Sequence, residues 1–421
     1  MTLRIIVVAF LVSRVAAADA LDGHWAGMLE RGSAKLDVSF DFGPGPTGRY
    51  TSATQRAMDY PLDEVRVTGA TVHVVLGGEI VFDGSMHGDA ITGRVHDSDG
   101  DSTFVLHRVT APKLPYDLSD VTFGDVKLTG MIASPRTPGR HPAVVLLHGS
   151  GPESRWGTNR FIADQFARAG IVALIYDKRG SGASGGDWKT ATYDDLARDA
   201  LAGIAVLAHR PDVDPTRIGV HGHSQGGIVA ALVARLAPTP LAFIVAEDTV
   251  AGPVWKQDLY RVEHALADEF KPDEARAAMA LYTLFVEVAR GVKPYAELER
   301  ASAPVANQAW YRWLALPPRD SWLWNAYPKT GNVDTLAYWR DVRVPTLLVY
   351  GERDKLVPVG DSIAAIEGAL TLHGAPVAAW IAPRAEHNLT VHPQHGEPFF
   401  FWHAAPGIIN SVAAWIRLVT G

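Results

Sequence analysis

A serine between two glycines stands at the position of this chain best suited to nucleophilic chemistry. The segment Gly222-His223-Ser224-Gln225-Gly226 follows the apolar run 217–220 and precedes the helical run 228–233. The glycines leave room for a sharp strand-to-helix turn that holds the serine hydroxyl in front of a sheet. The helix that follows directs unpaired N–H groups toward negative charge developing nearby. Because the pattern also fits an ordinary serine-capped turn, the interpretation depends on partners for Ser224.

A serine hydroxyl becomes a useful nucleophile when a histidine removes its proton and a carboxylate orients that histidine. The run 344–350 has the pattern of a buried strand, and Asp354 lies in the loop that follows it. A shorter strand predicted at 377–382 leads into His387. The order along the chain is therefore Ser224, Asp354, His387, which is the order in hydrolases with a nucleophile elbow.

Two other acids compete for the role of the carboxylate. Glu247 and Asp248 follow the strand predicted at 241–246. Asp354 can alternatively stabilise its own turn through side-chain hydrogen bonds. We favour Asp354 because the segment around it fits the hydrolase pattern better.

Other histidines compete for the role of the base. His392, His395 and His403 follow His387 within a short stretch. We favour His387 because it comes soonest after the predicted strand, and the other three stay open as alternatives.

Residues from about 115 to 421 resemble an α/β-hydrolase of the serine esterase type, with some likeness to the dienelactone hydrolase and prolyl oligopeptidase branch. The motifs that carry the resemblance are Leu147-His148-Gly149-Ser150-Gly151-Pro152, Tyr176-Asp177-Lys178-Arg179-Gly180-Ser181-Gly182, the serine turn, the segment 351–358 and His387. The resemblance implies that the backbone N–H groups of Ser150 and Gln225 hold the oxyanion, each contributing about 3 kcal/mol. Gly149 stays an alternative to Ser150, because loop geometry decides between them.

Two patterns that suggest a cofactor are rejected. Gly180-Ser181-Gly182-Ala183-Ser184-Gly185 fits a dinucleotide fingerprint, but the next convincing helix begins only near Tyr193. His221 and His223 have strand spacing without a cysteine or a clear third ligand, which argues against a metal site. Neither a metal nor an organic cofactor is expected.

Strands alternate with helices in the hydrolase-like part, which predicts an α/β fold with a doubly wound, mostly parallel sheet. Strands are expected near 121–125, 128–134, 143–147, 171–176, 217–221, 241–246, 344–350 and 377–382. Helices are expected near 159–169, 193–209, 225–236, 359–369 and 407–419.

Nearly a hundred residues separate the strands that end at 246 and begin at 344, which predicts a helical cap at 251–340. One helix of the cap begins at Pro272 and closes at Arg290-Gly291. The cap's dense aromatic residues are expected to fill its own core, and an apolar substrate pocket is the alternative. These residues are Trp310, Tyr311, Trp313, Trp322, Trp324 and Tyr327.

Residues 21–110 contain short, often alternating segments separated by Gly, Asp and Pro turns. This pattern predicts a small antiparallel β domain, a barrel or a sandwich, that is lipocalin-like in its opening Gly23–Gly27. Binding a ligand, covering the active site and stabilising the enzyme are alternative roles for it. A linker is expected at 111–115.

The remaining expectations come from the N-terminus and the composition. Residues 1–18 have a positive start, an apolar stretch and a small-residue cleavage site, which predicts a signal peptide and a periplasmic or secreted protein. A net charge of -7 without basic clusters argues against nucleic acid as a partner. The absence of cysteine excludes a disulfide framework. The sequence leaves the oligomeric state open.

These features predict a serine hydrolase that acts on a small-molecule ester through an acyl-enzyme, with Ser224 as nucleophile, His387 as base and Asp354 as its orienting acid. The alternatives are a peptidase of the prolyl oligopeptidase type, an acyltransferase and a non-catalytic binding protein with a relic triad.

Overall fold

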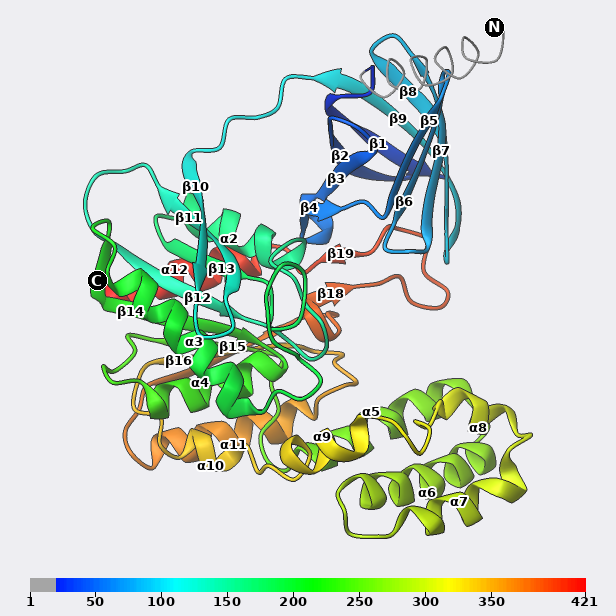
Figure 1. Ribbon diagram of the computed structural model, residues 1–421, viewed down its shortest axis with the longest axis vertical. Helices are drawn as coiled ribbons and strands as arrows, with labels where there is room; N and C mark the ends of the chain where they lie inside the picture. Colours follow the sequence, from blue (N-terminus) through cyan, green and yellow to red (C-terminus); the bar gives the residue numbers. More distant parts are fainter. Residues whose placement is uncertain (1–19) are drawn as a thin grey trace, which may run out of the picture. The chain divides into compact units, whose positions relative to one another are not determined.

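The computed structural model describes residues 20–421, which form two compact units (Figure 1). The first comprises the chain up to Pro115 together with Arg155–Asp164 and Val391–Ala404, and the second comprises the remaining residues. The signal peptide predicted at 1–18 lies outside the described residues, so export stays a prediction. Between residues 20 and 421, no helix is long and apolar enough to cross a bilayer.

Nine antiparallel strands form the main sheet of the first unit, in the order β4-β3-β2-β1-β9-β8-β7-β6-β5. The short strands β18 Thr390–Val391 and β19 His403–Ala404 form a separate two-stranded sheet. Their bounds are β1 Gly23–Arg31, β2 Ala34–Gly43, β3 Thr47–Ser52, β4 Ala57–Pro61, β5 Glu64–Thr68, β6 Thr71–Leu76, β7 Ile80–His87, β8 Ala90–Asp97 and β9 Gly100–Val109. Side chains alternate between buried and exposed along β2 and β9, so one face of the sheet carries the core. The predicted antiparallel β domain is confirmed, but it is a half-barrel and not a closed barrel or a sandwich.

The two later segments of the first unit are joined to its sheet by specific bonds. Met58 and Gly157 exchange backbone hydrogen bonds of 3.3 and 2.9 Å. The buried guanidinium of Arg160 lies 2.9 Å from a carboxylate oxygen of Asp59. These contacts place residues 155–164 with the half-barrel, although the sequence predicts them as part of the hydrolase domain.

The second unit is built on an eight-stranded sheet in the order β10-β11-β13-β12-β14-β15-β16-β17. Its strands are β10 Tyr116–Phe123, β11 Leu128–Pro135, β12 His141–Leu147, β13 Val172–Tyr176, β14 Val213–His223, β15 Ile244–Glu247, β16 Thr346–Gly351 and β17 Val377–Ala382. Strands β10 and β11 are antiparallel to their neighbours, and the pairs from β12 onward are parallel. This confirms the predicted α/β fold.

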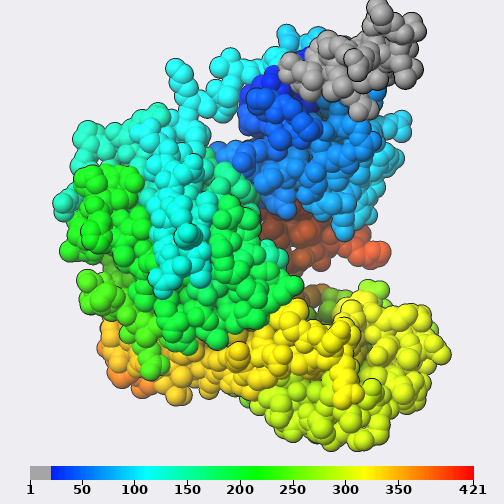
Figure 2. Space-filling model, viewed as in Figure 1, coloured from blue at the N-terminus to red at the C-terminus, as the bar shows by residue number. Residues whose placement is uncertain are grey.

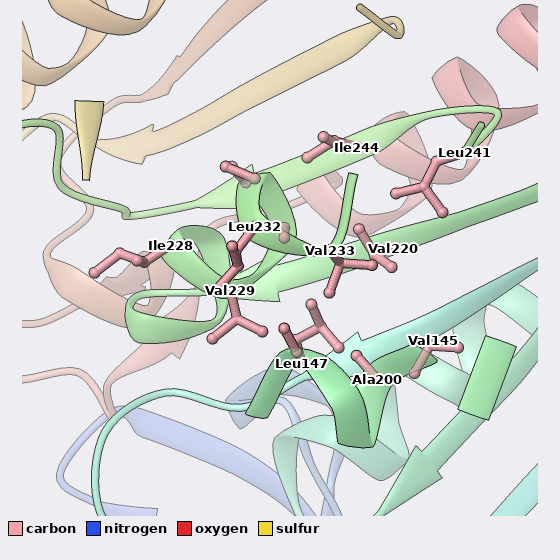
Figure 3. Packing of buried hydrophobic residues seen from close by; sticks show 14 of the residues in the cluster. Val145, Leu147, Ala200, Val220, Ile228, Val229, Leu232, Val233, Leu241 and Ile244 are labelled. Atoms are coloured by element: carbon pink, nitrogen blue, oxygen red, sulfur yellow. The ribbon is translucent and has the colours of Figure 1, made fainter. Parts of the chain in front are cut away.

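Helices cover both faces of this sheet. They are α3 Tyr193–Ala208, α4 Gln225–Leu236, α11 Val359–Thr371 and α12 Ile408–Thr420, together with the last turn of α2 Thr158–Arg168, whose residues from 165 onward belong to this unit. On one face, Val145, Leu147 and Val220 of the strands pack against Ala200 of α3 and the apolar side of α4 (Figure 3). On the other face, the rings of Phe243 and Trp415 meet edge to face at 6.4 Å. Burial of both faces explains why these strands are continuously apolar.

The cap between β15 and β16 is helical, and in the space-filling view its lime and yellow residues form a lobe of their own (Figure 2). Its helices are α5 Val254–Glu269, α6 Pro272–Ala289, α7 Tyr295–Ser302, α8 Ala309–Leu314, α9 Leu323–Thr330 and α10 Leu336–Trp339. Helix α6 begins with the expected proline and acidic first turn. The buried Trp310 belongs to the lobe's core, whereas Trp313 and Trp322 are each 40% exposed.

Candidate active site

Ser224 occupies the turn between β14 and α4 in a conformation that serines rarely adopt. Its φ is 52° and its ψ is -115°, which places a residue with a side chain in a strained region. The turn is fixed on both sides, since the N–H of Ser224 donates to the carbonyl of Glu247 at 2.7 Å and the N–H of Gly227 donates to the carbonyl of Ser224 at 3.0 Å. The strain is therefore held by the surrounding structure.

The two glycines of the serine turn are required by space. A Cβ added to Gly222 would lie 2.2 Å from the carbonyl oxygen of Gly226. A Cβ added to Gly226 would lie 2.3 Å from the carbonyl oxygen of Leu147, at the end of β12. Any side chain at either position would push the turn away from the sheet, as the sequence pattern indicates.

His387 and Asp354 meet at the ends of β17 and β16. The Nδ1 atom of His387 lies 2.8 Å from Oδ2 of Asp354. The other carboxylate oxygen of Asp354 accepts the N–H groups of Leu356 and Val357 at 2.7 and 3.1 Å. Burial lowers the pKa of His387, but the hydrogen bond to Asp354 and the surrounding acidic charges outweigh it and hold the pKa above its ordinary value.

The competing carboxylates have other partners. Glu247 is buried, with Oε2 at 3.3 Å from Nε2 of His221. Asp248 accepts the N–H of Gly351 at 2.9 Å, and burial followed by the charge of Glu247 raises its pKa well above the ordinary value. Ligand atoms of Asp248, Asp354 and His387 nevertheless all lie within 4.8 Å of one another. Asp248 is thus a second carboxyl group close to the histidine, while Asp354 holds its Nδ1.

The competing histidines belong to the first unit, whereas Ser224 belongs to the second. The ring of His392 stacks on Trp402 at 5.9 Å. The Nδ1 atom of His403 lies 2.9 Å from the carbonyl oxygen of Ala404, and His395 is exposed. None of the three is among the residues that line the cavity at Ser224.

The loop after β12 is fixed by a buried neutral histidine. Nε2 of His148 donates to the carbonyl of Tyr176 at 2.6 Å. Burial, helped by the charge of Lys178, lowers the pKa of His148 to about 3, so the ring is uncharged at neutral pH. Its hydrogen bond joins the loop that carries Gly149 and Ser150 to the end of β13.

Lys178 connects the two segments that carry the predicted oxyanion donors. Its Nζ donates to the carbonyl of Gly149 and to Oε1 of Gln225, each at 2.7 Å. Burial lowers the pKa of Lys178 to about 8, although the charge of Glu153 opposes the change. Lys178 belongs to one of the motifs that carry the hydrolase resemblance, but the sequence pattern assigns it no role; its place two residues after a buried strand is the available signal.

A cavity of about 460 Å³ contains Ser224 and His387. It is also lined by Ser150, Glu153, Tyr193, His223, Gln225, Ile228, Asp248, Val250, Val254, Gln257, Asp258, Arg261, Tyr327, Thr330, Gly331, Leu356, Val357 and Asn388. On the cap side, Asp258 accepts hydrogen bonds from Tyr327 and from Arg261. Of the six aromatic residues for which an apolar pocket is the alternative, only Tyr327 is among the described residues that line the cavity. Its hydroxyl and the neighbouring Asp258 and Arg261 give the cap side a largely polar wall.

The glycine-rich segment after β13 folds as a compact loop. Asp177 accepts the N–H of Ala183 at 2.9 Å, and the hydroxyl of Ser184 donates to the carbonyl of Asp177 at 2.6 Å. The next helix, α3, begins only at Tyr193 behind a capping box formed by Thr192 and Asp195. The segment therefore lacks the helix that a dinucleotide fingerprint requires directly after its glycines.

Comparisons with known proteins agree with this architecture. A family model described as "Serine aminopeptidase, S33" matches residues 139–391. Esterase EstD of Thermotoga maritima is 34% identical over 127 residues, which are 28% of this chain and 30% of that protein. An uncharacterised peptidase of Bacillus subtilis is 30% identical over 109 residues, which are 26% of this chain and 41% of that protein. The chain thus spans less than half the length of these curated relatives.

One of the similar solved structures is also an esterase by its description. An esterase of Pyrococcus furiosus matches with a TM-score of 0.44 and 22% identity, covering 74% of this chain and 94% of that chain.

Proposed function

Because the chain belongs to the serine aminopeptidase (S33) family of α/β-hydrolases, we propose that it hydrolyses carboxylic esters through an acyl-enzyme on Ser224. The observation that carries the proposal is the grouping of three residues from separate loops. Ser224 and His387 line one cavity, and Nδ1 of His387 is bonded to the buried Asp354. This leaves Nε2 of His387 as the nitrogen that can exchange a proton with substrate and serine.

In the first half of the reaction, His387 takes the proton of the Ser224 hydroxyl as the serine oxygen attacks the ester carbonyl. The carbonyl oxygen becomes an oxyanion, which the N–H groups of Gln225 and Ser150 stabilise. When the intermediate collapses, the bond to the alcohol oxygen breaks and His387 donates its proton to the leaving alcohol. Asp354 stabilises the charged imidazole throughout.

In the second half, a water molecule replaces the alcohol and loses its proton to His387. The resulting hydroxide attacks the acyl-enzyme, the bond to the serine oxygen breaks, and the proton returns to Ser224. The products are the carboxylic acid and the alcohol, and every residue regains its starting state. No step requires a cofactor.

A peptidase is the second candidate, because the matching family model carries that description and one curated relative is named a peptidase. The esterase proposal is supported by the similarity to EstD, which is named an esterase. Both candidates use the same serine, and they differ in the leaving group, an alcohol or an amine.

A panel of p-nitrophenyl esters with short and medium acyl chains and a set of aminoacyl p-nitroanilides separates the two candidates. We expect kcat/KM for the best ester to exceed that for the best anilide by at least about 100-fold, corresponding to roughly 2.7 kcal/mol in the barrier. Faster cleavage of an anilide than of every ester would support the peptidase and overturn the esterase proposal. Ser224→Ala gives the background, and Ser411→Ala, at an exposed position of α12, is the matched control.

A further inference from the structure

The first unit contains a second cavity, and we propose that it is a binding site for a small apolar ligand with a neutral or cationic polar end. Its volume is about 500 Å³, which lies within the range of cavities that hold small organic molecules, about 300–1,000 Å³. The lining residues all belong to the first unit. The proposal therefore concerns a site other than the one at Ser224 and does not depend on the proposed function.

The wall of this cavity is mainly hydrocarbon and aromatic ring. It is formed by side chains from β1, β2, β3, β4, β6, β7 and β8. The apolar residues of the wall are Leu29, Leu36, Tyr50, Leu76, Ile80, Phe82 and Val95. Water against these side chains would find few hydrogen-bond partners, so an apolar group is favoured over water along this part of the wall. Gln55, Thr158 and His392 contribute polar groups elsewhere in the lining.

The open space is confined to one end of the half-barrel, because the rest of its interior is filled. The ring of Phe82 packs edge to face on Phe40 at 5.2 Å and on Phe104 at 5.6 Å. Among these rings the remaining space is only about 10 Å³, close to the minimum that a single water needs. The cavity is thus a local feature and does not reflect loose packing of the whole unit.

The segment 391–404 covers this cavity through specific contacts. Phe401 and Trp402 line the space. The side chain of Gln55 donates to the carbonyl of Trp402 at 3.3 Å, and it accepts from the hydroxyl of Tyr50 at 3.1 Å. These contacts hold two aromatic rings over the apolar wall and close the end of the half-barrel.

Arg31 contacts the same segment, 391–404, through two of its aromatic rings. The guanidinium of Arg31 lies 4.4 Å from the ring centre of Phe399 and 5.7 Å from that of Phe401. It also donates to a carboxylate oxygen of Asp97 at 2.8 Å. The hydrogen bond holds the guanidinium on the sheet and the cation–π contacts join it to the cover, so we infer that the cavity keeps its shape without a ligand.

The charged groups that line the cavity are acidic, which defines the polar end of the ligand. Glu79, Asp97 and Asp99 line it, and the first and last of these are exposed. Asp97 already accepts from Arg31 and from the N–H groups of Asp99 and Gly100. Glu79 and Asp99 would therefore repel a carboxylate or phosphate head and tolerate an alcohol or an ammonium group.

The first experiment titrates the full chain with the neutral fluorophore N-phenyl-1-naphthylamine. Ala57 lines the cavity, and we expect Ala57→Trp to weaken binding by at least about tenfold because the indole occupies the space. Ala70→Trp, in the exposed turn before β6, is the matched control and should bind as the unchanged chain does. Absence of binding to the unchanged chain, or equal binding by both variants, would overturn the proposal.

Circular dichroism establishes whether each variant is folded. If Ala57→Trp does not fold, photolabelling of the unchanged chain with an alkyl diazirine amine decides the matter. Labelled peptides from 76–82 or 392–402 support the site, and labels confined to the second unit contradict it.

The second experiment tests the polar end by competition against the same fluorophore. Decylamine and decanol should displace it at concentrations at least about tenfold lower than decanoate, because two exposed carboxylates line the site. Glu79→Lys combined with Asp99→Lys should reverse the order of decylamine and decanoate. Equal displacement by all three compounds would overturn the inference about the polar end.

Discussion

The cavity at Ser224 and the cavity in the half-barrel are lined by different kinds of side chain. The first is lined by groups that carry charge or exchange protons, among them Asp248, Asp258 and His387. The second is walled by apolar side chains and covered by Phe401 and Trp402. Directional hydrogen bonds fix the groups that would react in the first, whereas the wall of the second is formed mainly by close packing of apolar side chains. An isosteric substitution that removes a hydrogen bond near Ser224 should therefore lower kcat. A substitution that removes side-chain volume from the half-barrel core should instead lower the free energy of unfolding.

The largest expected effect within this comparison is that of Asp354→Asn. The amide keeps the size of the carboxylate but removes its charge, so that Nδ1 of His387 loses its charged acceptor. We expect kcat for p-nitrophenyl acetate to fall by about 10⁴-fold, with little change in the urea midpoint of unfolding. Asp361→Asn, at an exposed position in the first turn of α11, is the control. A loss of less than tenfold would assign the role to another acid, and Asp248 would be the first to test.

A smaller effect is expected for Lys178→Met, which keeps the length of the side chain but removes both hydrogen bonds to Gly149 and Gln225. The two segments with the oxyanion donors then lose their common tether. Because those donors act in the transition state, we expect kcat to fall by about 10²-fold while KM changes little. The exposed Lys189→Met is the matched control. A rise in KM at unchanged kcat would show that Lys178 acts in substrate binding.

The dependence of kcat/KM on pH tests the role of charge at the Ser224 cavity. His387 must be neutral to accept a proton, and its pKa lies above the ordinary value, so kcat/KM should fall as pH decreases through a pKa above about 6.5. In Asp354→Asn the carboxylate is absent while burial still disfavours the charged ring. The residual activity should therefore persist to lower pH. An acid limb that stays in place, or moves to higher pH, would contradict this account.

The smallest expected effect on rate is that of Phe82→Ala, in the core of the half-barrel, where Phe82 is 3% exposed. Loss of the ring should lower the free energy of unfolding of the first unit by about 3–5 kcal/mol. The kcat of folded protein for p-nitrophenyl acetate should stay within about twofold, because Phe82 belongs to the first unit and shares no partner with the hydrogen-bonded groups at Ser224 in the second. Val109→Ala, on the exposed side of β9, is the control in urea denaturation. A tenfold loss of kcat without unfolding would contradict the claim that the half-barrel core affects stability and not the rate at Ser224.

The sequence was sufficient to predict which residues the second unit brings together. Ser224, Asp354 and His387 each follow a run of apolar residues, and parallel strands direct their carboxyl ends to one edge of a sheet. Even the bounds of most strands agree, although β15 is shorter than predicted and starts at Ile244. Residues that are distant in the sequence can thus be predicted to lie close together when strand direction alone brings them to one edge of a sheet.

Other features depend on tertiary contacts that no local pattern carries. Lys178 is buried because loops after β12 and β14 supply its partners, whereas a lysine after a strand usually lies at the surface. Pro272 and the closing Arg290-Gly291 predict the bounds of α6, but no such signal shows which face of α5 lines the cavity. The alternation in residues 21–110 predicted strands, yet closure into a barrel depends on whether the edge strands β4 and β5 pair, and they do not.

The most direct test of the central claim is labelling of the unchanged chain with a fluorophosphonate, followed by peptide mapping with mass spectrometry. The account predicts one label per chain, on Ser224, with no label in Ser224→Ala and normal labelling in Ser411→Ala. A label on a different serine, or a folded chain that does not react, would contradict the assignment of Ser224 as the nucleophile.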